Sequence, residues 1–247
     1  MREFGLIGKS LGHSFSQTYF TQKFQNLDLT DCSYELFELP AIAELPALLA
    51  SRPNLAGLNV TIPYKEQVWP YLSEVAPSAA RVGAVNVIEV TEDGRYIGHN
   101  TDYVGFKESL ERFYPHRSEN AAALILGTGG ASKAVEVALR DLGIRYWVVS
   151  RNPMGSGLTY DDLTPALVGG HSLIINATPL GTYPRVEESP ALPYAVLSSQ
   201  HYLYDLVYNP SETEFLRKGL EAGAHTLNGF EMLCLQAEAA WRIWNKE

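Results

Sequence analysis

The sequence predicts an α/β protein whose C-terminal part is a Rossmann-like, doubly wound parallel sheet. Short segments rich in Leu, Ile, Val, Phe and Tyr alternate with helix-like segments along the chain, as in sheets covered by helices. Near the middle, the glycine-rich run from Gly127 to Ala131 separates an apolar strand (121–126) from an amphipathic helix (132–142). A strand, a tight turn and a helix in this order form the unit that binds the pyrophosphate of a dinucleotide.

The N-terminal part also alternates strands with helices. A turn at Asp93 and Gly94 would join residues 84–90 and 95–98 into a hairpin at an edge of the sheet. Thr101 is a suitable cap for a helix that runs to Tyr114, so we expect the first domain to comprise residues 1–101. Its strands are expected at 2–8, 33–39, 55–60 and 84–90, and its helices near 16–27, 64–71 and 75–81.

The second domain is expected to comprise residues 102–236. Its later strands are expected at 146–150, 172–177, 202–207 and 224–227, with helices or loops between them, as a doubly wound parallel sheet requires. The last segment, about 229–247, carries apolar side chains at helical spacing from Gly229 to Trp244. We expect this helix to return to the first domain.

The composition is that of an ordinary globular protein and argues against several function classes. The chain has 247 residues and a net charge of -9, so a nucleic acid or a membrane surface is not an expected partner. Its 2 cysteines form no CxxC motif and its 6 histidines show no metal-ligand spacing, so we expect no disulfide framework and no metal. No apolar run approaches the roughly 20 residues of a membrane helix, and we expect a cytoplasmic protein.

The glycine turn and the strand after it favour NADP as cofactor. The glycines would let the backbone approach the phosphates, and the helix start would supply N–H groups. An Asp or Glu about 20 residues later would bind the ribose hydroxyl of NAD, whereas an Arg accommodates the 2'-phosphate of NADP. The next strand ends at Ser150 and Arg151, which favours NADP. The alternative for the glycines is a purely structural left-handed turn.

Polar side chains at the ends of predicted strands and helices form a second group of candidates. They are Ser14, Ser16, Thr61, Lys65, Asn86 and Asp102. Open α/β sheets bind ligands at the edge where their strands end, and hydroxyls, amides and a Lys–Asp pair suit a polyhydroxylated substrate with an uncharged ring. The alternatives are that Ser14 or Ser16 caps a helix, that Asp102 complements a helix dipole, and that Lys65 is a solvated surface lysine.

Eight motifs resemble, in order, those of the shikimate dehydrogenase family. They are SFS (14–16), NVTIPYK (59–65), GAVN (83–86), NTD (100–102), GTGGAS (127–132), NATPLG (176–181), DLVYNP (205–210) and GFEMLCLQA (229–237). The resemblance spans nearly the whole chain. Eight motifs in the family's order are far more specific than any one of them, so the structural alternatives lose weight together.

The resemblance implies the reversible reduction of 3-dehydroshikimate to shikimate by NADPH, in the biosynthesis of aromatic amino acids. It implies that substrate binds in the N-terminal domain and NADP in the C-terminal domain, with a cleft between them, and that Lys65 and Asp102 are the catalytic pair. It assigns substrate contacts to Ser14, Ser16, Thr61, Asn86, Tyr208 and Gln236. Cofactor contacts are assigned to Gly127, Gly129, Gly130, Ala131, Arg151, Thr178 and Gly229. We expect a monomer or a homodimer.

Two departures from the family pattern keep alternatives open. Gln17 stands where the family commonly has Pro, and only Arg151 is present of the two arginines that usually clamp the 2'-phosphate. Discrimination against NAD is therefore expected to be reduced. One alternative is a quinate/shikimate dehydrogenase that uses NAD. Another is a catalytically silent, ligand-sensing homologue, which would be expected to have lost Lys65 or Asp102, and both are present.

Overall fold

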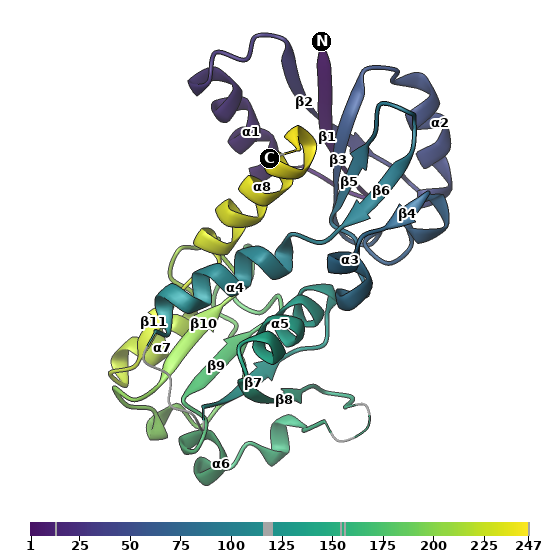
Figure 1. Cartoon of the computed structure of the whole chain (residues 1–247). Coiled ribbons are helices and arrows are strands. Elements are labelled where there is room, and N and C mark those ends of the chain that lie inside the picture. The colour runs from purple at the N-terminus through teal and green to yellow at the C-terminus, as the bar shows by residue number, and fades with distance from the viewer. Residues whose placement is uncertain (13, 116–120, 154, 156, 247) are drawn as a thin grey trace. The chain divides into compact units, whose positions relative to one another are not determined.

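The computed structural model of the chain describes residues 1–12, 14–115, 121–153, 155 and 157–246. The chain divides into two compact units, which are Met1–Thr101 with Ala237–Glu247 (unit 1) and Asp102–Gln236 (unit 2). Each unit contains one sheet with helices packed on it, which confirms the predicted α/β class (Figure 1). Within the described part of the chain, every helix is too short or too polar to span a membrane.

The described strands of unit 1 form one mixed sheet in the order β2-β1-β3-β5-β6-β4. Their bounds are β1 (Arg2–Gly8), β2 (Cys32–Glu38), β3 (Leu55–Val60), β4 (Glu74–Val75), β5 (Val87–Val90) and β6 (Tyr96–His99). β1 is parallel to β2 and β3, whereas β5 is antiparallel to both β3 and β6. The predicted hairpin at Asp93 and Gly94 is present. It does not form the edge of the sheet as we expected, because the short strand β4 pairs with β6.

Helices cover both faces of the unit 1 sheet. On one face, α1 (Phe15–Asn26) and residues 237–245 of α8 (Phe230–Asn245) enclose an aromatic core that includes Phe4, Phe20, Trp241 and Trp244. The opposite face packs on α2 (Leu45–Ser51), α3 (Pro77–Val82) and the short 3-10 helix η1 (Ile42–Glu44). The predicted alternation of strands and helices accounts for these two layers. The parallel strands have buried side chains on both faces, so helices must cover both.

One predicted helix of unit 1 is not formed. Residues 64–71 fold into turns that end in the 3-10 helix η2 (Trp69–Tyr71). Tyr64 and Val68 are both buried in the core of this face. Pro70 has no N–H group to continue a helical hydrogen-bond pattern, so the segment cannot extend into an α-helix.

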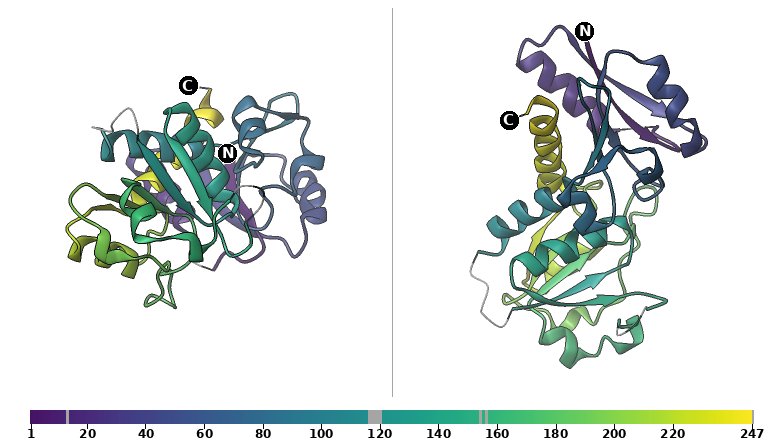
Figure 2. Two further views of the ribbon diagram at one scale, coloured as in Figure 1. Left: turned by 90° about the horizontal axis from the view of Figure 1, so that it is seen from below. Right: turned by 45° about the vertical axis from the view of Figure 1, so that its right-hand side comes forward.

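Unit 2 is a parallel sheet in the order β11-β10-β9-β7-β8, which confirms the predicted doubly wound architecture. The strands are β7 (Ala122–Leu126), β8 (Arg145–Val149), β9 (Leu173–Asn176), β10 (Tyr202–Asp205) and β11 (His225–Leu227). Helices α4 (Asp102–Phe113) and α5 (Gly130–Asp141) pack on one face, and α6 (Pro165–Gly169) and α7 (Glu214–Glu221) on the other (Figure 2). Two short 3-10 helices, η3 (Tyr160–Asp162) and η4 (Tyr194–Val196), complete the unit.

The strand order of unit 2 creates a switch point between β7 and β9. β7 lies between β8 and β9 in the sheet. The chain therefore passes from β7 to β8 on one side and then crosses back to β9 on the other side of β7. In open α/β sheets, ligands bind where the carboxyl ends of two such strands diverge. The loops after Leu126 and Asn176 therefore border the expected ligand edge.

A buried carboxylate, Asp205, holds the loops at this edge together. Asp205 ends β10, is 0% exposed, and accepts hydrogen bonds from Asn176 Nδ2 at 2.9 Å and Thr213 Oγ1 at 2.5 Å. The backbone N–H of Val207 donates a third bond at 3.0 Å. Burial raises the pKa of Asp205 to about 6, because the loss of water outweighs the three hydrogen bonds that lower it.

This shift predicts a pH dependence of stability that belongs to Asp205. Because its folded pKa of about 6 exceeds the ordinary value of 3.8, the folded state holds the proton more tightly than the unfolded chain. The stabilising contribution is fully present below pH 3.8 and is lost as pH rises through about 6. Urea denaturation of wild type and Asp205→Asn should show their difference in unfolding free energy falling by up to roughly 3 kcal/mol between pH 4 and 7. A difference that does not change with pH would contradict this account.

Candidate active site

The candidate substrate residues of unit 1 lie at one edge of its sheet. Thr61 and Lys65 follow the carboxyl end of β3, and the loop with Ser14 follows the parallel strand β1. β5 runs antiparallel to β3, so Asn86 lies at the same edge, directly before β5 rather than inside a strand as we expected. β6 is antiparallel to β5, which returns Thr101 to this edge as well.

Asn86 connects the segments that meet there. Its side chain is 3% exposed and forms two bonds with Thr101: Oδ1 accepts from the backbone N–H at 2.7 Å, and Nδ2 donates to Oγ1 at 3.0 Å. The carbonyl of Asn86 accepts from Val60 N at 2.8 Å. One residue earlier, Val85 N donates to the carbonyl of Lys65 at 2.8 Å. The backbone of Lys65 and the residue before Asp102 are therefore both held by the segment 85–86.

The two serines are at the start of α1. Ser14 is the N-cap, with Oγ accepting from Gln17 N at 3.4 Å, so the capping alternative is correct for Ser14. A hydroxyl that accepts a hydrogen bond still has its own proton to donate, so capping does not prevent Ser14 from binding a carboxylate. Ser16 is the second residue of the helix, and its hydroxyl lowers the pKa of Tyr34, which burial raises by more. Two hydroxyls at the positive end of a helix are a suitable anion site.

Thr61 is held at the end of β3 by close packing with β1. Its N–H donates to the carbonyl of Ile7 at 3.0 Å, and its carbonyl accepts from Tyr64 N at 2.9 Å. A Cβ added to Gly8 would lie 2.7 Å from Thr61 Cγ2, so the glycine allows the two strand ends to approach. Lys65, four residues later, is half-buried.

In unit 2, Asp102 and Gln236 are on helices that approach closely. Asp102 is the first residue of α4 and is buried. One turn later, a Cβ on Gly105 would lie 2.5 Å from the carbonyl oxygen of Met232 and 2.9 Å from Gln236 N. Only glycine allows this contact, which sets Gln236 against the first turn of α4. The side-chain amide of Gln236 donates to Leu233 O at 2.9 Å.

The glycine turn has the conformation that a phosphate-binding loop needs. Gly127 has φ +108°, a left-handed value that favours glycine, and an added Cβ would lie 2.9 Å from Thr178 Cγ2 across the switch point. Gly129 caps α5, which begins at Gly130, and Ala131 lies in its first turn. A Cβ at Gly129 or Gly130 would meet no atom within 4 Å, so the backbone there is accessible to a ligand. These residues fit a dinucleotide pyrophosphate.

Arg151 lies two residues beyond the end of β8 and is exposed. Burial raises the pKa of Tyr160 in η3, and the positive charge of Arg151 opposes this shift. Ser150, between the strand and Arg151, is buried, and its Oγ accepts from Asn152 N at 3.1 Å. The backbone of Arg151 is therefore held at the carboxyl edge of the sheet. An arginine that binds a 2'-phosphate must lie at this edge. Met154 and Ser156, which follow in the same loop, lie outside the described residues.

The loop after β9 is shaped by Asn176. Its Oδ1 accepts from both the N–H of Thr178 at 3.0 Å and Thr178 Oγ1 at 2.6 Å, and its Nδ2 binds Asp205. The position of Thr178 opposite Gly127 thus depends on two buried side chains at neighbouring strand ends.

Tyr208 and Gly229 belong to segments that pack on each other. Tyr208 lies three residues beyond β10 and is 38% exposed, and partial burial raises its pKa. Gly229 donates to the carbonyl of Val207 at 3.1 Å, and a Cβ there would lie 2.3 Å from the carbonyl oxygen of Leu206. Gly229 therefore has a structural requirement that the motif alone does not reveal.

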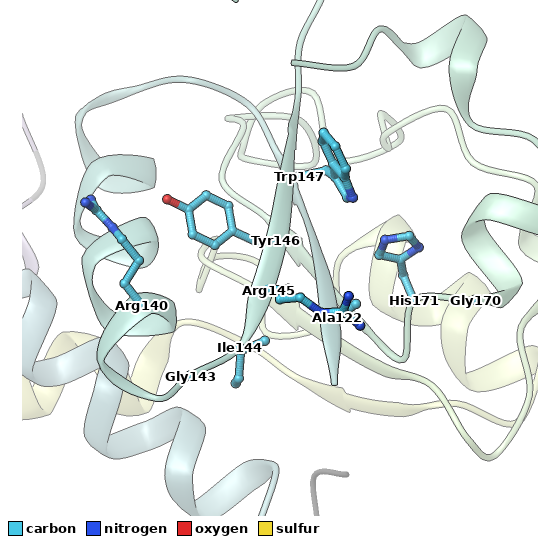
Figure 3. Close-up of a pocket in the computed structure, with 9 residues that line it drawn as sticks. All are labelled: Ala122, Arg140, Gly143, Ile144, Arg145, Tyr146, Trp147, Gly170 and His171. Carbon is cyan, nitrogen blue, oxygen red and sulfur yellow. The ribbon is translucent and has the colours of Figure 1, made fainter. Parts of the chain in front are cut away.

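A further pocket of unit 2 is at the opposite end of the strands (Figure 3). Its volume is about 730 Å³, and Ala122 and Arg145, the first residues of β7 and β8, line it together with Trp147 and His171. The glycine turn follows the last residue of β7. This pocket is therefore not the expected dinucleotide site.

Sequence reasoning did not assign roles to the buried side chains that support these residues. In unit 1, Tyr34 donates to Asn59, which in turn contacts the carbonyl of Asn86. In unit 2, Asn176 and Asp205 support Thr178. Asn59, Asn176 and Asp205 are inside the quoted motifs, so their polarity at strand ends was an available signal. Tyr34 is in a predicted strand, and nothing in its local sequence distinguishes it from a core tyrosine.

Known proteins are similar to the chain over its whole length. Residues 6–88 match the model of the shikimate dehydrogenase substrate binding domain. The shikimate dehydrogenase (NADP(+)) of Clostridium beijerinckii is 37% identical over 258 residues, covering 100% of this chain and 93% of that protein.

Two solved structures have a similar fold. The shikimate 5-dehydrogenase of Thermus thermophilus in complex with NADP(H) and shikimate has a TM-score of 0.87 at 33% identity, covering 100% of this chain and 94% of that one. The quinate dehydrogenase of Corynebacterium glutamicum in complex with NAD has a TM-score of 0.89 at 27% identity, with the same two coverages of 100% and 94%. With relatives above 30% identity over its full length, the chain belongs to the shikimate dehydrogenase family.

Proposed function

We propose that the protein catalyses the reversible, NADP-dependent reduction of 3-dehydroshikimate to shikimate, in the biosynthesis of aromatic amino acids. The observation that carries this proposal is the arrangement of Ser14, Ser16, Thr61, Lys65 and Asn86 at one edge of the unit 1 sheet. Hydroxyls, an amide and one ammonium at a single edge suit a hydroxylated carboxylic acid. Relatives that match 97% and 100% of this chain and are named shikimate dehydrogenase (NADP(+)) support the same conclusion.

In this proposal, unit 1 binds the substrate and unit 2 binds NADP. Ser14 and Ser16 donate to the substrate carboxylate at the start of α1. Thr61 also contacts the substrate, Asn86 and Gln236 bind ring hydroxyls, and Tyr208 lies near the carboxylate. Gly127, Gly129, Gly130 and Ala131 bind the pyrophosphate, Arg151 binds the 2'-phosphate, and Thr178 and Gly229 complete the cofactor contacts.

We assign the proton chemistry to Lys65 and Asp102. When bound, NADPH supplies a hydride to the carbonyl carbon, and negative charge then develops on the carbonyl oxygen. The ammonium of Lys65 stabilises that oxygen and donates a proton to it. Asp102 orients the ammonium, and in the oxidation direction the pair takes the proton from the hydroxyl. A silent ligand-sensing role would not need this pair.

The proposal includes a cytoplasmic location, where the thiols of Cys32 and Cys234 would stay reduced, and a monomer or homodimer as the active form. Quinate with NAD is the second candidate function, because the quinate dehydrogenase with NAD has a very similar fold. Steady-state oxidation of shikimate and quinate, each with NADP and NAD and followed at about 340 nm through nicotinamide reduction, tests the choice. Shikimate with NADP should have the highest kcat/KM, and a higher value for quinate with NAD would reject the proposal.

The catalytic role of Lys65 predicts a loss of turnover rather than of binding. In Lys65→Ala, kcat for shikimate should fall by about 100-fold or more because the proton donor is gone, while KM changes little. Lys246→Ala, which removes an exposed lysine of unit 1 that pairs with Glu92, is the matched control and should leave kcat unchanged. A Lys65→Ala protein with near-normal kcat and a raised KM would assign Lys65 to substrate binding instead.

The role of Arg151 predicts a selective effect on cofactor use. In Arg151→Ala, kcat/KM for NADP should fall by about tenfold or more, because a charge-assisted hydrogen bond to the 2'-phosphate is lost, and kcat/KM for NAD should not change. Arg145→Ala, at the opposite end of the same strand, should affect neither. Equal losses with both cofactors, or a wild-type preference for NAD, would show that Arg151 does not read the phosphate.

A further inference from the structure

The hydrogen bond between Asp205 and Asn176 has a defined direction. Asp205 Oδ1 accepts from the backbone N–H of Val207 at 3.0 Å, and a backbone N–H can only donate. The atom of Asn176 that faces this oxygen at 2.9 Å is therefore its amide nitrogen, Nδ2, which donates. Both side chains are 0% exposed, so water does not compete for these groups. Asp205 thus sets which way the amide of Asn176 points.

The oxygen of this amide takes up both donors of Thr178. Asn176 Oδ1 accepts from the backbone N–H of Thr178 at 3.0 Å and from Thr178 Oγ1 at 2.6 Å. The backbone N–H of Leu180 then donates to Thr178 Oγ1 at 3.3 Å. A hydroxyl has one proton and two lone pairs, so one lone pair of Thr178 is left and its proton is already used. Toward a ligand, this half-buried side chain can act only as an acceptor.

Thr178 and Arg151 lie on opposite sides of the glycine turn. β7, which leads into this turn, pairs with β8 on one side and with β9 on the other, and all three strands are parallel. Arg151 follows β8, whereas Thr178 follows β9. A dinucleotide with its pyrophosphate at the turn and its 2'-phosphate at Arg151 extends its other half, which contains the nicotinamide ribose, toward Thr178. That ribose carries hydroxyls, which can donate a hydrogen bond.

We propose that Asp205 is a positioning residue for the cofactor, acting through Asn176 to present Thr178 Oγ1 to a hydroxyl of the nicotinamide ribose. The proposal rests on the proposed function, in which unit 2 binds NADP. A phosphate group accepts hydrogen bonds, so an acceptor such as Thr178 Oγ1 does not suit it. Without Asn176 in this orientation, Thr178 could change its rotamer and turn its proton toward the ligand. Asp205 and Asn176, both fully buried, act without touching the cofactor.

The test is a double-mutant cycle between Asp205 and Thr178, measured by calorimetric titration. Thr178→Val removes the hydroxyl, so Kd should rise about threefold to tenfold for both NADP and NAD, which share the nicotinamide ribose. Asp205→Ala should raise both constants in the wild-type background, but by less than about twofold in the Thr178→Val background. Asp205→Asn keeps an oxygen that can accept from Asn176 and Val207, so it should bind both cofactors like wild type. Equal effects of Asp205→Ala in both backgrounds would overturn the proposal.

Two further variants separate positioning from stability. Asp205→Leu leaves no cavity and no acceptor, and it replaces Asp205→Ala in the cycle if the alanine variant does not fold. Tyr114→Phe is the matched control, because Tyr114 is 4% exposed and its hydroxyl shares a hydrogen bond of 2.7 Å with Ser172, directly before β9. This bond is at the opposite end of the strand, so Tyr114→Phe should lower the unfolding midpoint without changing Kd for NADP. If it raises that Kd as much as Asp205→Ala does, the effect of Asp205 is one of stability and the proposal fails.

A fragment of the cofactor separates this inference from the proposed function. Adenosine 2',5'-bisphosphate carries the 2'-phosphate but lacks the nicotinamide ribose, so Thr178→Val should leave its Kd within about twofold of wild type. Equal weakening of the fragment and of NADP would place Thr178 at the adenosine half and overturn the inference. A wild-type protein that binds NAD but not NADP would contradict the proposed cofactor, and the same cycle with NAD would still test the inference. A protein that binds neither dinucleotide would contradict both proposals.

Discussion

Unit 1, to which we assign substrate binding, depends on one buried amide. Asn86 is almost without access to water, so its oxygen and its N–H groups need partners inside the protein. Thr101 supplies both, through its backbone N–H and its hydroxyl. Because β5 and β6 are antiparallel, this pairing closes the edge at which β3 also ends. Lys65 is joined to this pairing by the backbone of Val85, and Asp102 directly follows Thr101. These are the two residues to which we assign the proton chemistry.

Unit 2, to which we assign cofactor binding, depends on a different physical requirement, which is close backbone approach. Gly127 and Gly105 each bring two segments to distances that a side chain would prevent. At the switch point this approach leaves the N-terminus of α5 accessible beside Thr178. Asp205 and Asn176 then hold the neighbouring loops by hydrogen bonds rather than by apolar packing. Buried polar networks of this kind specify one arrangement, because any other leaves groups without partners.

The features that could be predicted from the sequence are those encoded locally. The glycine turn between an apolar strand and an amphipathic helix is one, and the alternation that gives the parallel sheet of unit 2 is another. Local patterns failed where tertiary contacts decide. Residues 64–71 contain helix-forming side chains, but Tyr64 and Val68 turn into the core and Pro70 blocks a helix. The strand β4 has only two residues, which is too short for a periodic signal.

The residues that support the site could not be predicted from local patterns either, because tertiary contacts decide their role. Tyr34 is 25 positions from Asn59, and the sheet order β2-β1-β3 brings their side chains within hydrogen-bond distance. Local patterns single out Asn86 as a polar candidate, but they predict its partner Thr101 only as a helix cap. A family resemblance names the residues that touch ligands, and the structure adds those that hold them in place.

Isothermal titration of Asn86→Ala with shikimate and, separately, with NADP tests the central claim most directly. Loss of the amide should raise Kd for shikimate by about tenfold or more. Kd for NADP should stay within about twofold, and tryptophan emission, to which the core residues Trp241 and Trp244 contribute, should remain that of the folded protein. Unchanged shikimate affinity in a folded Asn86→Ala protein would contradict the account.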